Sequence, residues 1–143
     1  AVLSDLKHGR NHQNTLCSTS NEIAEKRVEK AAKHYAMRVN EARNLANSFG
    51  AKFLHFYQPM LFDIERLTSY ESKLYEQNPC FTIAASVRSF FNEIFLKQSP
   101  ESIDLTQIYT NKNLFFDYTH VSSLGYLIAA EQMTPFILDE INN

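Results

Sequence analysis

The 143-residue chain has no tryptophan, only three glycines and two cysteines, and no apolar run long enough to span a membrane. It also lacks a cluster of basic residues, and its formal net charge is −2, so nothing in its electrostatics favours nucleic-acid binding. The two cysteines, Cys17 and Cys80, could pair or remain free, and two such residues do not indicate a redox compartment. We therefore expect neither a membrane span nor a nucleic-acid partner, and the cellular location stays open.

The residues that are present suffice for one hydrophobic core. Of the chain, 44% is hydrophobic, and eleven phenylalanines and seven tyrosines can form a dense set of aromatic contacts. No internal repeat, low-complexity segment or linker divides the sequence. We therefore expect residues 1–143 to form a single domain.

A long first helix is predicted by its capping signals. The sequence Thr19-Ser20-Asn21-Glu22 is a capping box, so a helix should cover about residues 21–49, and Gly50 suits a left-handed C-terminal cap. Apolar residues recur every three or four positions, which predicts one buried stripe. Its members are Ala24, Val28, Ala31, Tyr35, Val39, Ala42, Leu45 and Phe49.

Three further helices follow. Thr68-Ser69-Tyr70-Glu71 is a second capping box and opens a short helix. Another helix is predicted over about residues 82–97, and Ser122 or Ser123 can cap a final one, which Pro135 should kink or shorten. The apolar face predicted for the final helix consists of Tyr126, Ala129, Ala130, Met133 and Ile137.

Short apolar segments between these helices predict strands. Residues 1–6 indicate a strand weakly, and residues 51–57 and 103–109 indicate strands more clearly. His55 lies inside the second segment, where a structural role is a better interpretation than a catalytic one. Strands that alternate with long helices predict an α/β fold with layers of helices on a short parallel sheet.

The stretch most suggestive of chemistry is Phe116-Asp117-Tyr118-Thr119-His120. Asp117 precedes His120 by three residues, so its carboxylate can accept a hydrogen bond from one imidazole nitrogen and leave the other free as a base. A purely structural hydrogen bond is the alternative. A metal site is less well supported, because two ligands without neighbouring cysteines or histidines make a poor zinc set.

This Asp-x-x-His block resembles the last conserved block of the SGNH (GDSL-type) hydrolases, which supplies two members of a Ser-His-Asp triad. Residues 103–109 and 53–59 resemble the segments that precede it in that family. The resemblance implies a three-layer α/β/α, flavodoxin-like fold with a short parallel sheet, incomplete in this chain. It also implies a serine esterase or acylhydrolase acting on carboxylic esters, including carbohydrate O-acetyl esters, with Asp117 and His120 catalytic and without a metal or organic cofactor.

The same resemblance assigns further site residues. Gly9-Arg10-Asn11 matches a Gly-x-Asn motif whose amide donates to the oxyanion, which makes Asn11 and Gly9 oxyanion candidates, although His12 replaces the family's aspartate. A polar loop is the alternative interpretation. In the family, the loop after residues 53–59 shapes the substrate pocket, so Gln58, Met60, Leu61 and Phe62 are candidates for lining it, and core packing explains these residues almost as well.

The nucleophile block is missing. The sequence has no Gly-Asp-Ser, and its Ser4-Asp5 lacks both the glycine and a preceding apolar strand. We therefore expect the chain alone to be inactive, with the serine in a missing N-terminal segment of the same or a second chain. A small ester or an acylated carbohydrate would be the substrate. The alternative is a non-catalytic carbohydrate- or protein-binding module.

Overall fold

A computed structural model of the chain describes residues 21–77, 80–109 and 113–142. The chain is mostly helical, with 64% helix and 5% strand. The elements are α2 (Asn21–Ser48), β1 (Phe56–Tyr57), the 3-10 helix η2 (Leu61–Asp63), α3 (Ser69–Glu76), α4 (Phe81–Gln98), β2 (Ile103–Asp104) and α5 (Ser123–Asn142).

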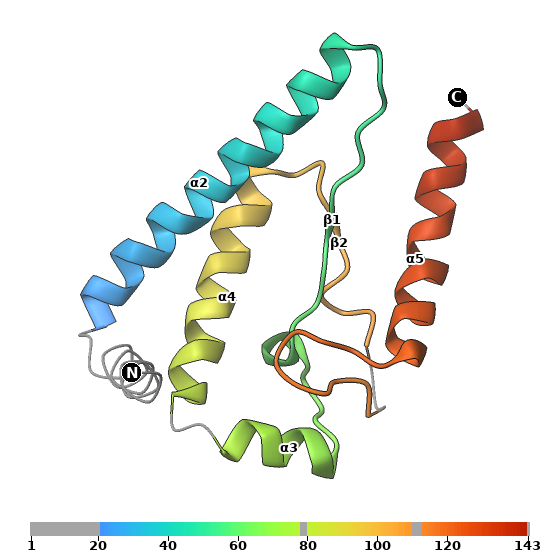
Figure 1. Ribbon diagram of the computed structural model, residues 1–143. Helices are drawn as coiled ribbons and strands as arrows, with labels where there is room; N and C mark the ends of the chain where they lie inside the picture. The colour runs from blue at the N-terminus through green and yellow to red at the C-terminus, as the bar shows by residue number, and fades with distance from the viewer. Residues whose placement is uncertain (1–20, 78–79, 110–112, 143) are drawn as a thin grey trace, which may run out of the picture.

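The helices surround a minimal pair of strands (Figure 1). Strands β1 and β2 are parallel, with Phe56 opposite Ile103 and Tyr57 opposite Asp104. Because successive side chains of a strand point to opposite faces, Tyr57 meets α4 while Phe56 meets α5, where its ring lies 6.2 Å from that of Phe136. The strand pair therefore lies between the packed helices α2 and α4 on one side and α5 on the other.

The predicted three-layer α/β/α fold is wrong, because the described residues contain only this two-stranded sheet. The segment predicted as a strand over residues 103–109 leaves the ladder when the side chain of Asp104 accepts a hydrogen bond from the Thr106 amide at 2.8 Å. A turn follows, in which the Ile108 amide donates to the Leu105 carbonyl. Such side-chain to backbone bonds compete with strand pairing.

The predicted strand over residues 51–57 is shortened for a related reason. Pro59 has no amide hydrogen to donate, and the next amide, that of Met60, donates to the Asp63 carboxylate at 2.8 Å. This bond begins η2 within the segment that the resemblance assigns to the loop after residues 53–59. The weak strand predicted at residues 1–6 lies outside the described residues, as do Gly9, Asn11 and Cys17.

Helix ends agree well with their sequence signals. Thr68 accepts from the Glu71 amide while the Glu71 carboxylate accepts from the Thr68 amide, which confirms the second capping box. Gly50 has a φ of 68°, the left-handed conformation predicted for it. Helix α4 covers the predicted third helix almost residue for residue. The final helix, however, continues through Pro135 to Asn142 and is not shortened there.

The stripe predicted for α2 is only partly correct. The buried residues are Ala32, Ala36 and Val39, which share a cluster with Phe95 of α4, whereas Leu45 and Phe49 are 61% and 81% exposed. Small side chains allow the two helices to approach closely. The C-terminal turns of α2 extend beyond the end of α4 (Figure 1), which agrees with the exposure of Leu45 and Phe49.

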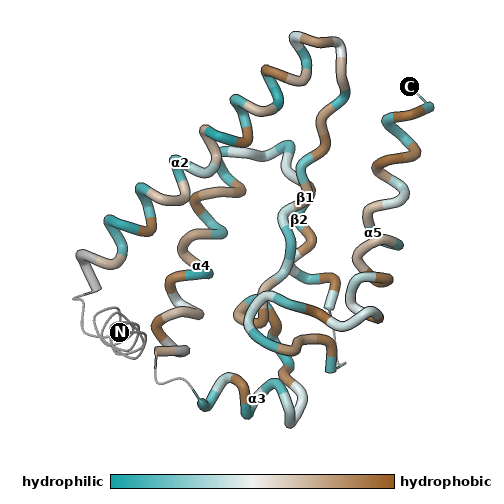
Figure 2. The backbone as a smooth tube through the Cα atoms, in the orientation of Figure 1, coloured by the Kyte–Doolittle hydropathy of each residue, from teal (hydrophilic) through white to brown (hydrophobic). Residues whose placement is uncertain are grey.

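Helix α5 has hydrophobic residues along much of its length (Figure 2). Its predicted apolar face is only partly covered, because Ala129 and Met133 are half-buried whereas Tyr126 is 61% and Ile137 39% exposed. Other large apolar residues of this helix are exposed as well, among them Leu124, Leu127, Leu138 and Ile141. None of the helices in the described ranges has the length and apolar character needed to cross a membrane.

Candidate functional site

A closed loop over residues 114–122 presents the Asp117–His120 pair. At its base the Ser122 amide donates to the Leu114 carbonyl at 2.7 Å, and Phe115 forms an antiparallel bridge with Val121. Closer to the tip, the Phe116 amide donates to the His120 carbonyl at 2.9 Å. These contacts bring the two ends of the loop together and turn its tip outward.

Asp117 organises the tip of this loop. Its Oδ1 accepts hydrogen bonds from the backbone amides of Thr119 and His120, both at 2.8 Å, and its Oδ2 accepts one from His120 Nδ1 at 2.7 Å. The predicted hydrogen-bonding distance between the two side chains is confirmed. The amide of His120, the amide of Thr119 and then the imidazole lower the pKa of the Asp117 carboxyl far below its ordinary value. Asp117 is therefore ionised at neutral pH and able to hold the imidazole in one tautomer.

His120 presents its other nitrogen to solvent. Its side chain is 70% exposed, and that of Asp117 is 50% exposed. In the described ranges, the structure shows a protein hydrogen-bond partner for Nδ1 but none for Nε2. An imidazole held at Nδ1 and open at Nε2 has the geometry of a general base that awaits a proton donor.

The two serines that follow do not complete this pair. Ser122 Oγ accepts from the Gly125 amide at 3.4 Å, so it caps α5 as predicted. Ser123 is the first residue of that helix. Gly125 itself packs against Val121 so closely that a β-carbon would lie 2.7 Å from Val121 Cβ. The close contact holds the start of α5 against the end of the loop.

Glu71 holds the base of the loop from the opposite side. It is a buried residue of α3, 1% exposed, and its Oε1 accepts from the amides of Leu114 and Phe115 at 3.1 and 3.4 Å. Its Oε2 accepts from the amide and the hydroxyl of Thr68. Four donors thus satisfy one buried carboxylate, which ties α3 to the loop. The sequence indicates Glu71 only as a capping residue of α3, and its contact with the loop was not predicted.

A cavity of about 330 Å³ opens beside the loop. Gln58 and Met60, two of the predicted lining residues, line it together with Thr119. The hydroxyl of Thr119 lies 3.3 Å from both Asp117 Oδ1 and His120 Nδ1, so the cavity wall touches the pair directly. The hydrophobic wall consists of Tyr35, Phe56, Tyr57 and Phe91.

The other two predicted lining residues lie elsewhere. Phe62 stacks on Tyr118 with ring centroids 5.9 Å apart and packs against the hydrophobic cluster that contains Leu61. Leu61 is fully buried, and its amide donates to the Tyr118 carbonyl at 3.0 Å. These two residues hold the loop in place through their contacts with Tyr118, and neither of them lines the cavity.

An ion pair that sequence analysis did not identify supports the cavity. Arg88 of α4 donates to Asp63 from Nε and Nη2 at 3.0 to 3.2 Å, and its guanidinium lies 4.5 Å above the Tyr57 ring. Asn92 donates to the same carboxylate and accepts from the Tyr57 hydroxyl. Burial raises the pKa of Tyr57 well above its ordinary value, so this hydroxyl keeps its proton.

His55 is a structural histidine, as predicted. Its Nδ1 lies 3.0 Å from Ser102 Oγ and its Nε2 lies 3.1 Å from the Tyr35 hydroxyl, while Phe95 packs edge-on against the ring. Burial, followed by the nearby positive charge of Arg43, lowers the pKa of His55. Both ring nitrogens are therefore occupied, and His55 has no nitrogen left for catalysis.

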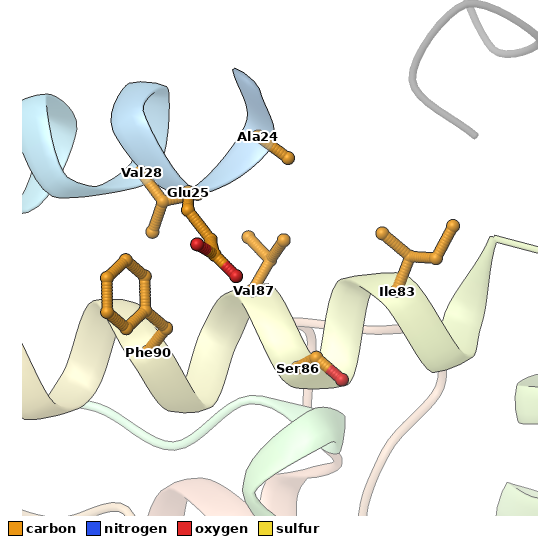
Figure 3. Close-up of a pocket in the computed structure, with 7 residues that line it drawn as sticks. All are labelled: Ala24, Glu25, Val28, Ile83, Ser86, Val87 and Phe90. Carbon is orange, nitrogen blue, oxygen red and sulfur yellow. The ribbon is translucent and has the colours of Figure 1, made fainter. Parts of the chain in front are cut away.

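A second cavity, of about 370 Å³, lies between the first turns of α2 and α4 (Figure 3). Ala24, Val28, Val87 and Phe90 give it an apolar lining, and the figure shows Glu25 of α2 reaching toward α4. Its polar lining consists of Glu25 and Ser86, and no histidine is among the described lining residues. Over the described ranges, no group of three or more histidine, cysteine, aspartate or glutamate side chains could hold a metal ion.

Asn11 and Gly9, the predicted oxyanion donors, lie outside the described residues, so the structure does not place them near the pair. No family model, curated protein or solved structure matches this chain. The likeness to the SGNH hydrolases therefore depends on the residues of the Asp-x-x-His block and the segments before it.

Proposed function

We propose that Asp117 and His120 form the acid–histidine part of an ester-hydrolysing site whose nucleophilic serine is not among residues 1–143 and is supplied by an upstream segment or by a second chain. The observation that supports this most directly is the 2.7 Å contact between Asp117 Oδ2 and His120 Nδ1, with Nε2 open to solvent. The resemblance of this block to that of the SGNH hydrolases points to the same chemistry. Carboxylic esters are the proposed substrates.

Each residue has a definite role in the proposed reaction. His120 Nε2 takes the proton of the serine hydroxyl as its oxygen bonds to the ester carbonyl carbon, and Asp117 stabilises the imidazolium through Nδ1. The tetrahedral intermediate collapses with loss of the alcohol, to which His120 returns the proton. Water then attacks the acyl-serine by the same sequence of transfers, which releases the carboxylic acid and restores the serine.

The proposal predicts that the chain alone is inactive. Purified 1–143 should hydrolyse 4-nitrophenyl acetate no faster than buffer, since loss of the serine from such a triad costs about a millionfold in turnover. In a chain extended upstream to include a Gly-Asp-Ser block, turnover should be measurable and His120→Ala should abolish it. Asp117→Asn should lower it by up to about ten-thousandfold, because the wrong tautomer would then be favoured.

Two outcomes would contradict this assignment. Activity of 1–143 that depends on His120 would require a nucleophile within the chain. Activity of the extended chain that survives His120→Ala would remove the pair from the reaction.

A non-catalytic binding module is the second candidate function. The observation in its favour is that the described residues that line the 330 Å³ cavity include no serine or cysteine. The two functions differ in one measurement, since a binding module should retain its ligand but show no turnover in the extended chain.

A further inference from the structure

The cavity beside the loop contains a group of aromatic rings close to one another. The ring of Tyr35 lies 6.1 Å from that of Phe91 and 6.5 Å from that of Tyr57, and the latter two rings are nearly parallel, at 14°. Phe56 adds a fourth ring to the lining. Tyr35 is 40% exposed, so a ligand in the cavity could reach its ring.

Arg88 adds a planar cation to this lining, but its charge is already balanced. Nε and Nη2 donate to Asp63, and Nη2 also donates to the Gln58 carbonyl at 3.1 Å. Asp63 in turn is buried, with its side chain 3% exposed. An anionic ligand would therefore gain little from a guanidinium that already has a carboxylate partner. One face of the guanidinium already lies 4.5 Å from the Tyr57 ring, so only its opposite face is left to stack on a ligand ring.

We infer that this cavity binds an uncharged aromatic ring, such as the aryl group of an ester, with the polar end of the ligand toward Thr119. Aromatic rings prefer offset or edge-on contact with other rings, which this lining offers on several sides. The volume of about 330 Å³ is at the lower end of ordinary ligand sites and suits a single substituted ring. Binding does not depend on hydrolysis, and only the placement of the ring as part of an ester rests on the proposed function.

Methyl benzoate can test this inference on the 1–143 chain, with the methyl groups of Met60 and Thr119 as NMR reporters. Both methyl signals should shift on titration, with a dissociation constant on the order of 1 mM. Methyl cyclohexanecarboxylate, which has a similar size but no π system, should bind several-fold more weakly. The benzoate anion should bind no more tightly than the neutral ester, because Arg88 is already paired.

Variants of Tyr35 separate ring contact from other effects. Tyr35→Leu should weaken methyl benzoate binding by about three- to tenfold, whereas Tyr35→Phe, which keeps the ring, should bind as the parent does. Tyr70→Leu is the matched control, since Tyr70 is a similarly exposed tyrosine on α3 and is not among the cavity residues. It should leave binding unchanged, and thermal unfolding should show that each variant is folded.

Four results would overturn the inference. Equal affinity for the cyclohexane ester would show that the cavity does not select aromatic rings, and tighter binding of benzoate would show an anion site. Preferential binding of methyl glucoside would indicate a sugar site. Unchanged affinity in Tyr35→Leu would place the ligand elsewhere. None of these results depends on turnover, so they are distinct from a failure of the hydrolysis assay.

Discussion

The pKa of Asp117 is lowered mainly by backbone groups. The amides of His120 and Thr119 donate to Oδ1, and the imidazole of His120 contributes a third hydrogen bond to Oδ2. Of these hydrogen bonds, that from the His120 amide lowers the pKa of Asp117 most, and that from the Thr119 amide comes next. The backbone amides of the loop therefore stabilise the charged carboxylate independently of the imidazole. This charged carboxylate then orients the side chain of His120.

A titration of His120→Ala can check this order of causes. The substitution removes the imidazole but keeps the amide, so the pKa of Asp117 should rise only part of the way and stay below the ordinary 3.8. Because the folded pKa is depressed, this carboxylate favours the folded state above pH 3.8, and that contribution is lost as the pH falls through the folded pKa. Carboxyl 13C shifts of Asp117 measured against pH give the value directly. A return to the ordinary value in His120→Ala would show that the imidazole dominates.

The spacing of Asp117 and His120 was enough to predict their contact, because both residues lie in one turn. The remaining parts of the site were not predictable in the same way. Tyr35, Arg88 and Thr119 meet at one cavity although they are far apart in the sequence. No local sequence pattern predicts a contact between residues so far apart. Arg88 also lies in a helix, where an arginine exposed to solvent is as common as one in an ion pair.

Among the contacts between secondary-structure elements, those of Glu71 join α3 to the base of the loop. Its carboxylate is buried and accepts from Thr68 on its own helix and from Leu114 and Phe115 on the loop. Removing an acceptor of this kind leaves buried amides without partners, which costs more than the hydrogen bonds contribute. The position of the Asp117–His120 pair thus depends on a residue far from it in sequence.

Glu71→Ala should lower the free energy of unfolding by about 2–4 kcal/mol in urea denaturation. Glu71→Gln keeps one oxygen acceptor and should cost less. In both variants the amides of Leu114 and Phe115 should exchange hydrogen faster, because their acceptor is lost or weakened. Glu76→Ala on the exposed end of the same helix is the matched control and should change stability by less than about 0.5 kcal/mol. Equal effects of the two alanine variants would contradict the role of Glu71.

Helices were predictable to within a few residues, whereas strands were not. A helix satisfies its backbone within one segment, and its limits are set by local signals such as Thr68 with Glu71 or the positive φ of Gly50. A strand is defined by the neighbour it pairs with. Residues 51–57 and 103–109 have the composition of buried strands, but each pairs over only two residues, because Pro59 and Asp104 direct the chain elsewhere.

Across the whole molecule, as far as its residues are described, the hydrophobic core is divided into two clusters. One contains Phe95 with the small residues of α2, and the other surrounds Leu61 and the buried residues of the loop. Between them lies the carboxylate of Asp63, to which Arg88 and Asn92 of α4 donate. This polar contact connects the helix pair to the part of the chain that presents Asp117 and His120.

Asp63→Asn should therefore lower the stability of the fold strongly, although the two side chains are nearly equal in size. It leaves the Arg88 guanidinium, whose side chain is 12% exposed, without a charged partner, which should cost about 3–5 kcal/mol. The double variant Asp63→Asn with Arg88→Met removes the stranded charge and should recover part of that loss. Glu140→Gln, which breaks the exposed pair with Lys52, is the control and should cost less than about 1 kcal/mol.

The same variant should also reduce the cooperativity of unfolding. If the Asp63 contact couples the two clusters, amides near Val121 should lose hydrogen-exchange protection in Asp63→Asn while those near Phe95 keep theirs, because α2 and α4 still pack on each other. Hydrogen exchange followed residue by residue distinguishes this from uniform destabilisation. A parallel loss of protection in both clusters would show that apolar packing, and not the Asp63 contact, holds the two parts together.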